Sequence, residues 1–187
     1  QNDDSRYIGL TMPRVLGRIP YGSKTIPAQT FSFEEQIRED ESGSDYLWIN
    51  SAWELAGKIV ESFEEYGWCA SIRGVEGGGL VKSLPAYTYT SMTGERAMQC
   101  PTQVAISDRR EKELSDLGFI PLVHCKGTDY AAFFAVQSAN KPRLYNSDQA
   151  NANARLSSQL PYILATSRFA HYLKSIVRDK VGSFMSR

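Results

Sequence analysis

The sequence has few of the residues from which catalytic and metal sites are built. Its 187 residues include two histidines and three cysteines, Cys69, Cys100 and Cys125. No two cysteines have the Cys-x-x-Cys spacing that is typical of zinc sites. An odd number of cysteines without such spacing is typical of free thiols in a reducing compartment. The sequence therefore predicts no metal ion and no cofactor, and it indicates a cytoplasmic protein.

A surplus of charge and a long apolar run are also absent. Lys plus Arg and Asp plus Glu both number 21, so the formal net charge is zero. Nucleic-acid binders need a basic surplus, so none is expected. No apolar run approaches the roughly 18 residues of a transmembrane helix, and the polar start QNDDSRY does not resemble a signal peptide. The sequence begins without an initiator Met, which indicates a fragment of a longer protein.

The clearest predicted element is a helix at 52–66. Ser51 and Glu54 have the spacing of a capping box, and Gly67 stands where a left-handed C-terminal cap is expected. Apolar residues recur at the three-four spacing of one helix face: Ala52, Leu55, Ala56, Ile59, Val60 and Phe63. An apolar run at 68–72 predicts a strand after the helix.

The glycine-rich stretch Gly74–Gly79 follows this predicted strand, as a phosphate-binding loop would. However, Leu80 and Val81 stand where that motif requires Lys and Ser or Thr, and Pro85 prevents a following helix. We interpret the stretch as a loop that is either flexible or closely approached along its backbone by other residues. The alternative is a nucleotide-binding domain, which predicts thermal stabilisation by ATP.

A second unit has the same order of helix, glycine, aromatic residue and apolar run, since SDLG-FIPLV resembles EEYG-WCASI. We predict a strand at 102–106, a helix at 109–117 with a capping box of Asp108 and Glu111, and a strand at 119–123. These elements would form a right-handed βαβ crossover. The two similar helices would pack alike on one sheet.

Three further strand regions complete the predicted sheet structure. They are a strand at 7–11, a hairpin at 86–99, and an antiparallel strand at 130–136 that follows the turn at Lys126-Gly127. The acidic segment 34–45 is either a solvated loop, which we favour, or a docking loop. Residues 137–147 are a predicted loop.

A long helical pattern runs from Asp148 to Val181, and Pro161 should kink or split it. Beyond the proline, apolar residues cover more than one stripe, which predicts burial on more than one side. The expected fold is therefore a single α+β domain over 1–187, with a mixed β-sheet flanked by helices and a long C-terminal helical segment kinked near Pro161.

The sequence offers a weak catalytic alternative, a cysteine hydrolase that uses Cys125 and His171. A thiol nucleophile needs a base within hydrogen-bonding distance. Adjacent residues on a strand point to opposite faces, so His124 cannot be that base if the strand continues to Cys125. A buried cysteine is usually a small hydrophobic residue. We therefore assign no catalytic residue.

Aromatic residues are the main surplus, with eight Phe, three Trp and ten Tyr. Several lie in segments that do not fit one predicted core: Trp48, Trp53, Tyr87 and Tyr89. Aromatic residues are enriched at protein interfaces, although they are equally ordinary core residues. We lean slightly toward an interface.

Three segments carry a resemblance to a known family. They are YGWCASIRGVEGGGLV at 66–81, DRREKELSDLGFIPLVHCKGTDYAAFF at 108–134, and the run from NANARLSSQLPYILATSRF onward at 151–187. Residues 7–22 fit as well. Together these segments closely resemble the large sheath subunit of the bacterial type VI secretion system, the TssC/VipB family.

This resemblance implies a structural role without catalysis. Such a subunit pairs with the small sheath subunit, TssB/VipA, and the pairs and further copies assemble into a helical contractile sheath around a tube of Hcp rings. Contraction delivers effectors, and the AAA+ ATPase ClpV disassembles the sheath. Family members are longer, so this chain would be a central-to-C-terminal fragment.

Overall fold

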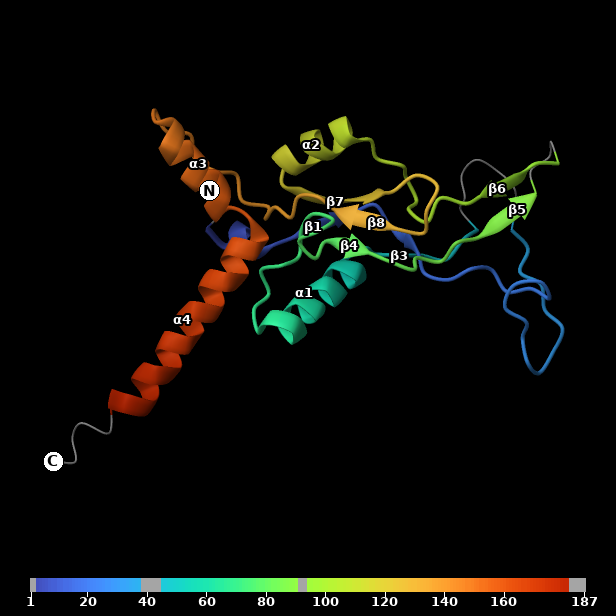
Figure 1. The fold of residues 1–187 in the computed structure, drawn as a ribbon, viewed down its shortest axis with the longest axis horizontal. Coiled ribbons are helices and arrows are strands. Elements are labelled where there is room, and N and C mark those ends of the chain that lie inside the picture. The colour runs from blue at the N-terminus through green and yellow to red at the C-terminus, as the bar shows by residue number, and fades with distance from the viewer. Residues whose placement is uncertain (1–2, 38–44, 91–93, 182–187) are drawn as a thin grey trace.

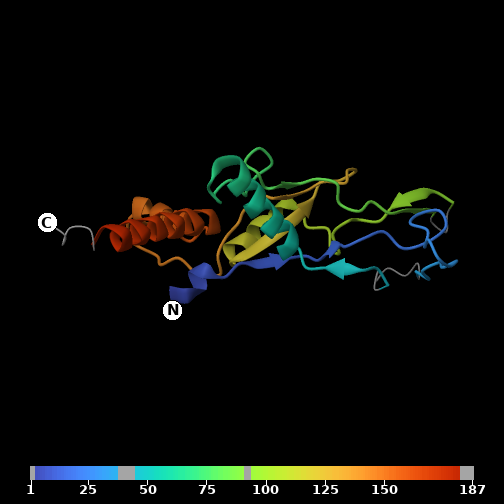
Figure 2. The same cartoon turned by 90° about the horizontal axis from the view of Figure 1, so that it is seen from below.

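A computed structural model describes residues 3–37, 45–90 and 94–181 of the chain. The fold is α+β, as predicted, and it is elongated (Figure 1). A small mixed sheet lies at the centre, a two-stranded hairpin lies at one end, and a long C-terminal helix projects from the other (Figures 1 and 2). The projecting C-terminal helix therefore lies mostly outside the core.

The central sheet has four strands in the order β1-β7-β8-β4. β1 (Leu10–Met12) runs parallel to β7 (Phe119–His124), while β8 (Ala131–Phe133) runs antiparallel to β7 and β4 (Leu80–Val81) runs antiparallel to β8. The sheet is thus mixed, as predicted. The parallel partner of β7 is the N-terminal strand, so the predicted βαβ crossover from 102–106 is wrong.

The predicted strand at 102–106 is reduced to an isolated bridge between Val15 and Thr102. This region instead supports β2 (Val15–Leu16), since the N–H of Leu16 donates to the carbonyl of Pro101 over 2.8 Å. β2 itself pairs antiparallel with β3 (Trp48–Ile49). The predicted N-terminal strand begins later than expected, because a 3-10 helix, η1 (Asp3–Tyr7), takes up Tyr7.

Helix α1 (Ala52–Tyr66) has the predicted length, and Gly67 ends it with a left-handed φ of 71°. The predicted capping box is wrong. Ser51 has helical backbone angles and its side chain makes no capping hydrogen bond. Asn50 caps instead, because its Oδ1 accepts the N–H of Ala52 over 2.9 Å. The same oxygen accepts the hydroxyl of Thr11 over 2.8 Å, which ties the helix start to β1.

Helix α2 (Asp108–Asp116) also lacks its predicted capping box. Asp108 is already the first helical residue, and the extended residue before it is Ser107. Glu111 therefore cannot complete a box with Asp108, and its Oε1 accepts the hydroxyl of Ser115 over 2.9 Å. The helix ends before Gly118, whose φ is 91°.

The two helices lie on opposite faces of the central sheet, with α2 on one side and α1 on the other (Figures 1 and 2). The prediction that they pack alike is therefore wrong. The core lies between them and is built from fully buried side chains such as Ile120, Leu122 and Phe133. Leu55 of α1 and Ile72 join the same cluster.

The hairpin is confirmed as β5 (Thr88–Thr90) paired antiparallel with β6 (Arg96–Met98). The predicted strand at 68–72 is wrong, because residues 68–69 form a bend and residues 70–72 are irregular, with no strand partner. Residues 137–147 contain no helix or strand.

The C-terminal helical segment is split, as predicted, into α3 (Asp148–Ser157) and α4 (Leu160–Val181). The break is held by the segment after β8. The hydroxyl of Ser138 donates to the carbonyl of Ser158 over 2.6 Å, and the N–H of Leu160 donates to the carbonyl of Val136 over 3.0 Å. Pro161 stands in the first turn of α4, where a missing N–H costs no helical hydrogen bond.

Candidate functional site

The structure does not bring Cys125 and His171 together. Cys125 begins the turn between β7 and β8, where its N–H donates to the carbonyl of Tyr130 over 2.9 Å. This turn lies at the end of the sheet that faces away from α4, the helix that carries His171 (Figures 1 and 2). The geometry therefore offers nothing in support of the cysteine hydrolase.

His124 instead contacts a different cysteine. Its Nδ1 lies 3.6 Å from the Sγ of Cys100, and its Nε2 lies 2.7 Å from the carbonyl oxygen of Thr128. All three cysteines are free and half-buried. Sequence reasoning missed this pair because 24 residues separate its members and the pairing depends on how the hairpin returns to β7.

The glycine-rich loop is a packed backbone turn, as the favoured interpretation predicted. Its N–H groups bond to the chain itself: Gly74 donates to the carbonyl of Phe133 over 2.7 Å, and Gly79 donates to the carbonyl of Gly74 over 2.8 Å. A Cβ on Gly79 would lie 2.6 Å from the oxygen of Phe133. β4 follows the loop where a phosphate site needs a helix N-terminus. The N–H groups of Gly74 and Gly79 are therefore already bonded within the chain, and the loop is not followed by the helix of a nucleotide site.

Within the described ranges, no group of three or more His, Cys, Asp or Glu side chains is placed to hold a metal ion. Over the same residues, every helix is too short or too polar to cross a bilayer.

The start of the acidic segment is bound to the loop that precedes it. Arg18 donates to both carboxylate oxygens of Glu35, over 2.6 and 3.1 Å, and the N–H of Tyr21 donates to the same carboxylate. The hydrogen bond from Arg18 holds the pKa of Glu35 below its ordinary value. A hydrogen bond from Ser23 similarly lowers the pKa of Glu34. Residues 38–44 of the predicted acidic loop lie outside the described residues.

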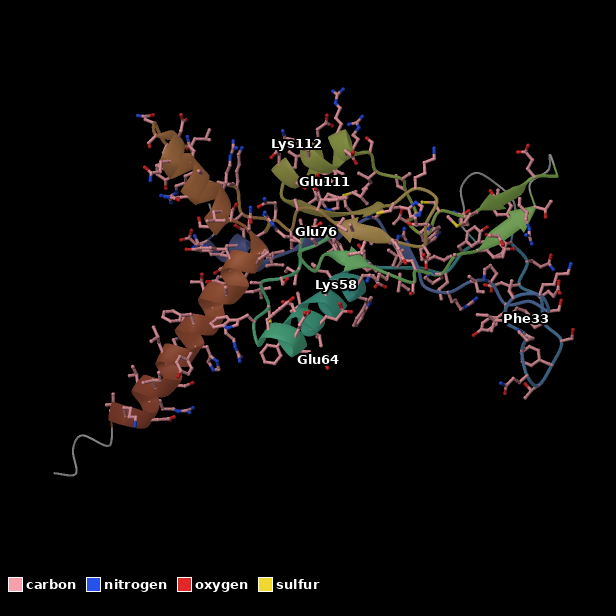
Figure 3. All side chains as sticks on the ribbon, viewed as in Figure 1. Phe33, Lys58, Glu64, Glu76, Glu111 and Lys112 are labelled. Atoms are coloured by element: carbon pink, nitrogen blue, oxygen red, sulfur yellow. The ribbon has the colours of Figure 1, made fainter. Side chains whose placement is uncertain are left out.

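Helix α4 differs most from its predicted environment. We expected burial on more than one side, but its buried residues are Pro161 and Ile163 at its start. Six large apolar side chains farther along are between 40% and 64% exposed. We call them the α4 stripe: Phe169, Tyr172, Leu173, Ile176, Val177 and Val181. Their three-four spacing places them on one helix face, and this half of α4 projects beyond the rest of the described chain (Figures 1 and 3).

A groove of 520 Å³ lies where the α4 stripe meets the turn after α1. Three aromatic residues line it, Trp68, Phe169 and Tyr172, together with Gly67, Arg168, His171 and Ser175. The guanidinium of Arg168 lies 4.9 Å from the ring centre of Phe63 and joins the two helices at this point.

The chain was compared with known proteins. Residues 1–140 match the VipB family model, described as the EvpB/VC_A0108 tail sheath N-terminal domain. Residues 149–187 match a second model, the EvpB/VC_A0108 tail sheath gpW/gp25-like domain. The chain belongs to the VipB tail sheath family.

A curated relative supports the same assignment. The VipB-family chain is 56% identical over all 187 residues to the type VI secretion system sheath protein TssC1 of Pseudomonas aeruginosa strain PAO1. It spans 37% of the length of that relative. Residues 141–148 separate the two matched ranges. The VipB N-terminal region therefore holds the sheet, and the gpW/gp25-like region holds α4 and all of α3 except its first residue.

The aromatic residues that we could not place divide into two groups in this VipB-family chain. Tyr46, Trp48, Tyr87 and Tyr89 form a cluster near the hairpin, with successive ring centres 5.9 to 6.3 Å apart. Trp53 is 72% exposed on α1. The cluster packs the hairpin against β3, so these rings have a structural use, whereas Trp53 remains on the surface.

Proposed function

We propose that this chain is part of a structural subunit of the type VI secretion contractile sheath. In this proposal the full-length protein pairs with the small sheath subunit, TssB/VipA. Copies of the pair assemble into a helical tube around the Hcp inner tube, and contraction drives effector delivery. The observation that carries the proposal is the match of the whole chain, at 56% identity, to a named sheath protein.

The exposed apolar surface supports an assembling role. Monomeric soluble proteins rarely expose large contiguous apolar patches, and such patches often mark interaction sites. The α4 stripe has this character, since its six side chains follow one another along one face of a projecting helix. We propose that the stripe is buried when the full-length protein assembles.

The proposed role is non-enzymatic and cytoplasmic. Nucleotide hydrolysis belongs, in this proposal, to the ClpV AAA+ ATPase that disassembles the sheath. The bonded N–H groups of the glycine-rich loop agree with that division, because they leave no phosphate cradle at Gly74 and Gly79.

Electron microscopy of the full-length protein, co-expressed with its presumed small partner, tests the proposal directly. We expect long hollow tubes. A soluble monomer that does not bind the partner would contradict the assignment.

A pair of variants on α4 tests whether assembly buries the α4 stripe. Leu173→Asp places a charge within the stripe, and we expect tubes to be lost, because burying an unpaired carboxylate costs several kcal/mol, on the order of 3 or more. Ser167→Asp adds the same charge to the polar face of the same helix and should leave tubes intact. Equal effects of the two substitutions on tube formation would contradict the proposed burial of the α4 stripe.

The catalytic alternative has its own test. Cys125→Ser removes the thiol that a hydrolase would need, and we expect effector secretion to be unchanged. If secretion were lost while sheaths still formed, the non-enzymatic role would be contradicted.

A further inference from the structure

Cys100 and His124 form a thiol–imidazole pair that neither the family assignment nor the sheath role uses. Cys100 lies just after β6 and His124 is the last residue of β7, so the return of the hairpin to the sheet brings them together. Sγ and Nδ1 are 3.6 Å apart, within hydrogen-bonding range for sulfur. Both residues are half-buried, so neither is enclosed in the core.

The hydrogen bonds around His124 fix which nitrogen carries the proton. Nε2 lies 2.7 Å from the carbonyl oxygen of Thr128. A carbonyl oxygen can only accept, so Nε2 must be the N–H donor. In the neutral ring Nδ1 then presents its lone pair, and this lone pair faces Cys100. The thiol therefore donates to a base whose orientation is set by a third group, which is the arrangement that activates nucleophiles.

Thr102 provides a second polar contact to the sulfur. Its Oγ1 lies 3.3 Å from the Sγ of Cys100 and also 3.2 Å from the carbonyl oxygen of Val104. The Thr102 side chain is buried and held in place, but its hydroxyl hydrogen can rotate between these two acceptors. It can donate to Val104 while the sulfur is a thiol and to the sulfur when it is a thiolate.

The other two cysteines lack this environment. In the part of the chain that the structure describes, neither Cys69 nor Cys125 has a histidine or another base in hydrogen-bonding contact with its sulfur. All three cysteines fall in the same half-buried class. They are internal controls for the chemistry of Cys100.

We propose that Cys100 is a peroxide-reactive thiol and that His124 is its base. The Cys100 thiol gives its proton to Nδ1 of His124, and the thiolate sulfur attacks one oxygen of a hydroperoxide. The S–O bond forms as the O–O bond breaks, and the leaving oxygen takes the proton from the imidazolium. With hydrogen peroxide the products are Cys100 sulfenic acid and water, so sulfur is oxidised by two electrons and the peroxide is reduced.

The test uses the full-length protein, hydrogen peroxide and dimedone, a reagent that traps sulfenic acids. The labelled cysteines are identified by peptide mass spectrometry over a time course. We expect Cys100 to be trapped at least about tenfold faster than Cys69 or Cys125, because thiolate character controls this reaction. Equal rates at the three cysteines would overturn the proposal.

His124→Gln is the matched variant. The glutamine amide nitrogen reaches the position of Nε2 and keeps the donation to Thr128, while nothing replaces the Nδ1 lone pair. We expect trapping at Cys100 to fall to the rate at Cys69, with an unchanged melting temperature. Unchanged rapid trapping in His124→Gln would overturn the role of His124. If that variant fails to fold, the comparison of the three wild-type cysteines still decides whether Cys100 is the reactive thiol.

Discussion

Two stretches of this chain have nearly the same local pattern and different structures. In both, a helix ends at a glycine with positive φ, Gly67 or Gly118, and an aromatic residue and an apolar run follow. The run after Gly118 forms β7, one of the two inner strands of the sheet. The run after Gly67 forms no strand: residues 68–69 form a bend, and residues 70–72 are irregular.

The difference comes from what lies beside each run. β7 has a hydrogen-bonded neighbour on each side, β1 and β8, and four of its six residues are buried. The other run is held back against its own helix. The Ser62 hydroxyl donates to the carbonyl of Trp68 over 2.8 Å and accepts the N–H of Ser71 over 3.1 Å. Local sequence therefore made both runs capable of forming a strand, and the available neighbours selected one.

The largest expected effect is a difference in unfolding free energy between substitutions at matching positions of the two runs, one buried and one half-buried. Ile120 and Cys69 occupy the same position in the two patterns, two residues after the glycine. Ile120→Ala should lower the free energy of unfolding by about 2 to 5 kcal/mol, because the side chain is fully buried in the core. Cys69→Ala should cost less than about 1 kcal/mol. Urea unfolding of the full-length protein measures both changes in the free energy of unfolding. Similar losses in the two variants would show that the two runs are equally buried.

The next prediction compares the two glycines. An alanine at either position must adopt a left-handed conformation, which costs about 1 to 2 kcal/mol. A Cβ at Gly67 meets open space, whereas at Gly118 it would lie 3.2 Å from the carbonyl oxygen of Ser138. Gly118→Ala should therefore lower the melting temperature more than Gly67→Ala. A larger loss of melting temperature in Gly67→Ala would mean that the segment around Ser138 can shift at little cost in free energy.

The smallest effect concerns the hydroxyl that holds the first run in place. Ser62→Ala removes two hydrogen bonds from a buried side chain and should cost about 1 kcal/mol. Glu113 stands at the matching position before Gly118, where it pairs with exposed Arg109 and Arg110. Glu113→Ala should cost about 0.5 kcal/mol or less. Hydrogen exchange at 68–72 should rise in the first variant and stay unchanged in the second.

The periodicity of apolar residues predicted the elements that neighbouring residues in the sequence specify. The helices α1 and α2, the strand β7 and the hairpin were found because apolar spacing and turn residues specify them. The two capping boxes failed for different reasons. Ser51 directly precedes α1, but it has helical backbone angles and its side chain makes no capping hydrogen bond. Asp108 is already the first residue of α2 and so cannot be its cap. The crossover failed because the true partner of β7 is β1, far away in sequence, and no local pattern reports that choice.

Local sequence patterns also could not predict the environment of α4 or the contact between Cys100 and His124, because both depend on how distant parts of the chain pack. Apolar residues on several faces of α4 predicted burial, yet the described chain supplies little to cover them. Cys100 and His124 meet because the β5–β6 hairpin returns beside the end of β7. The sequence patterns around the two residues contain no motif that anticipates this contact. The family resemblance, by contrast, depended on residue identity over long stretches and was confirmed.

The parallel pairing of β1 with β7 has a consequence for biosynthesis. Leu10 must find Phe119, so β1 leaves the ribosome long before its partner strand exists. Contacts between residues distant in sequence slow folding, because a long loop must close before they form. During that delay the nascent chain carries β1 as an unpaired strand, a segment open to pairing with other chains. Synthesis of this chain therefore includes an interval in which β1 has no β7 to pair with.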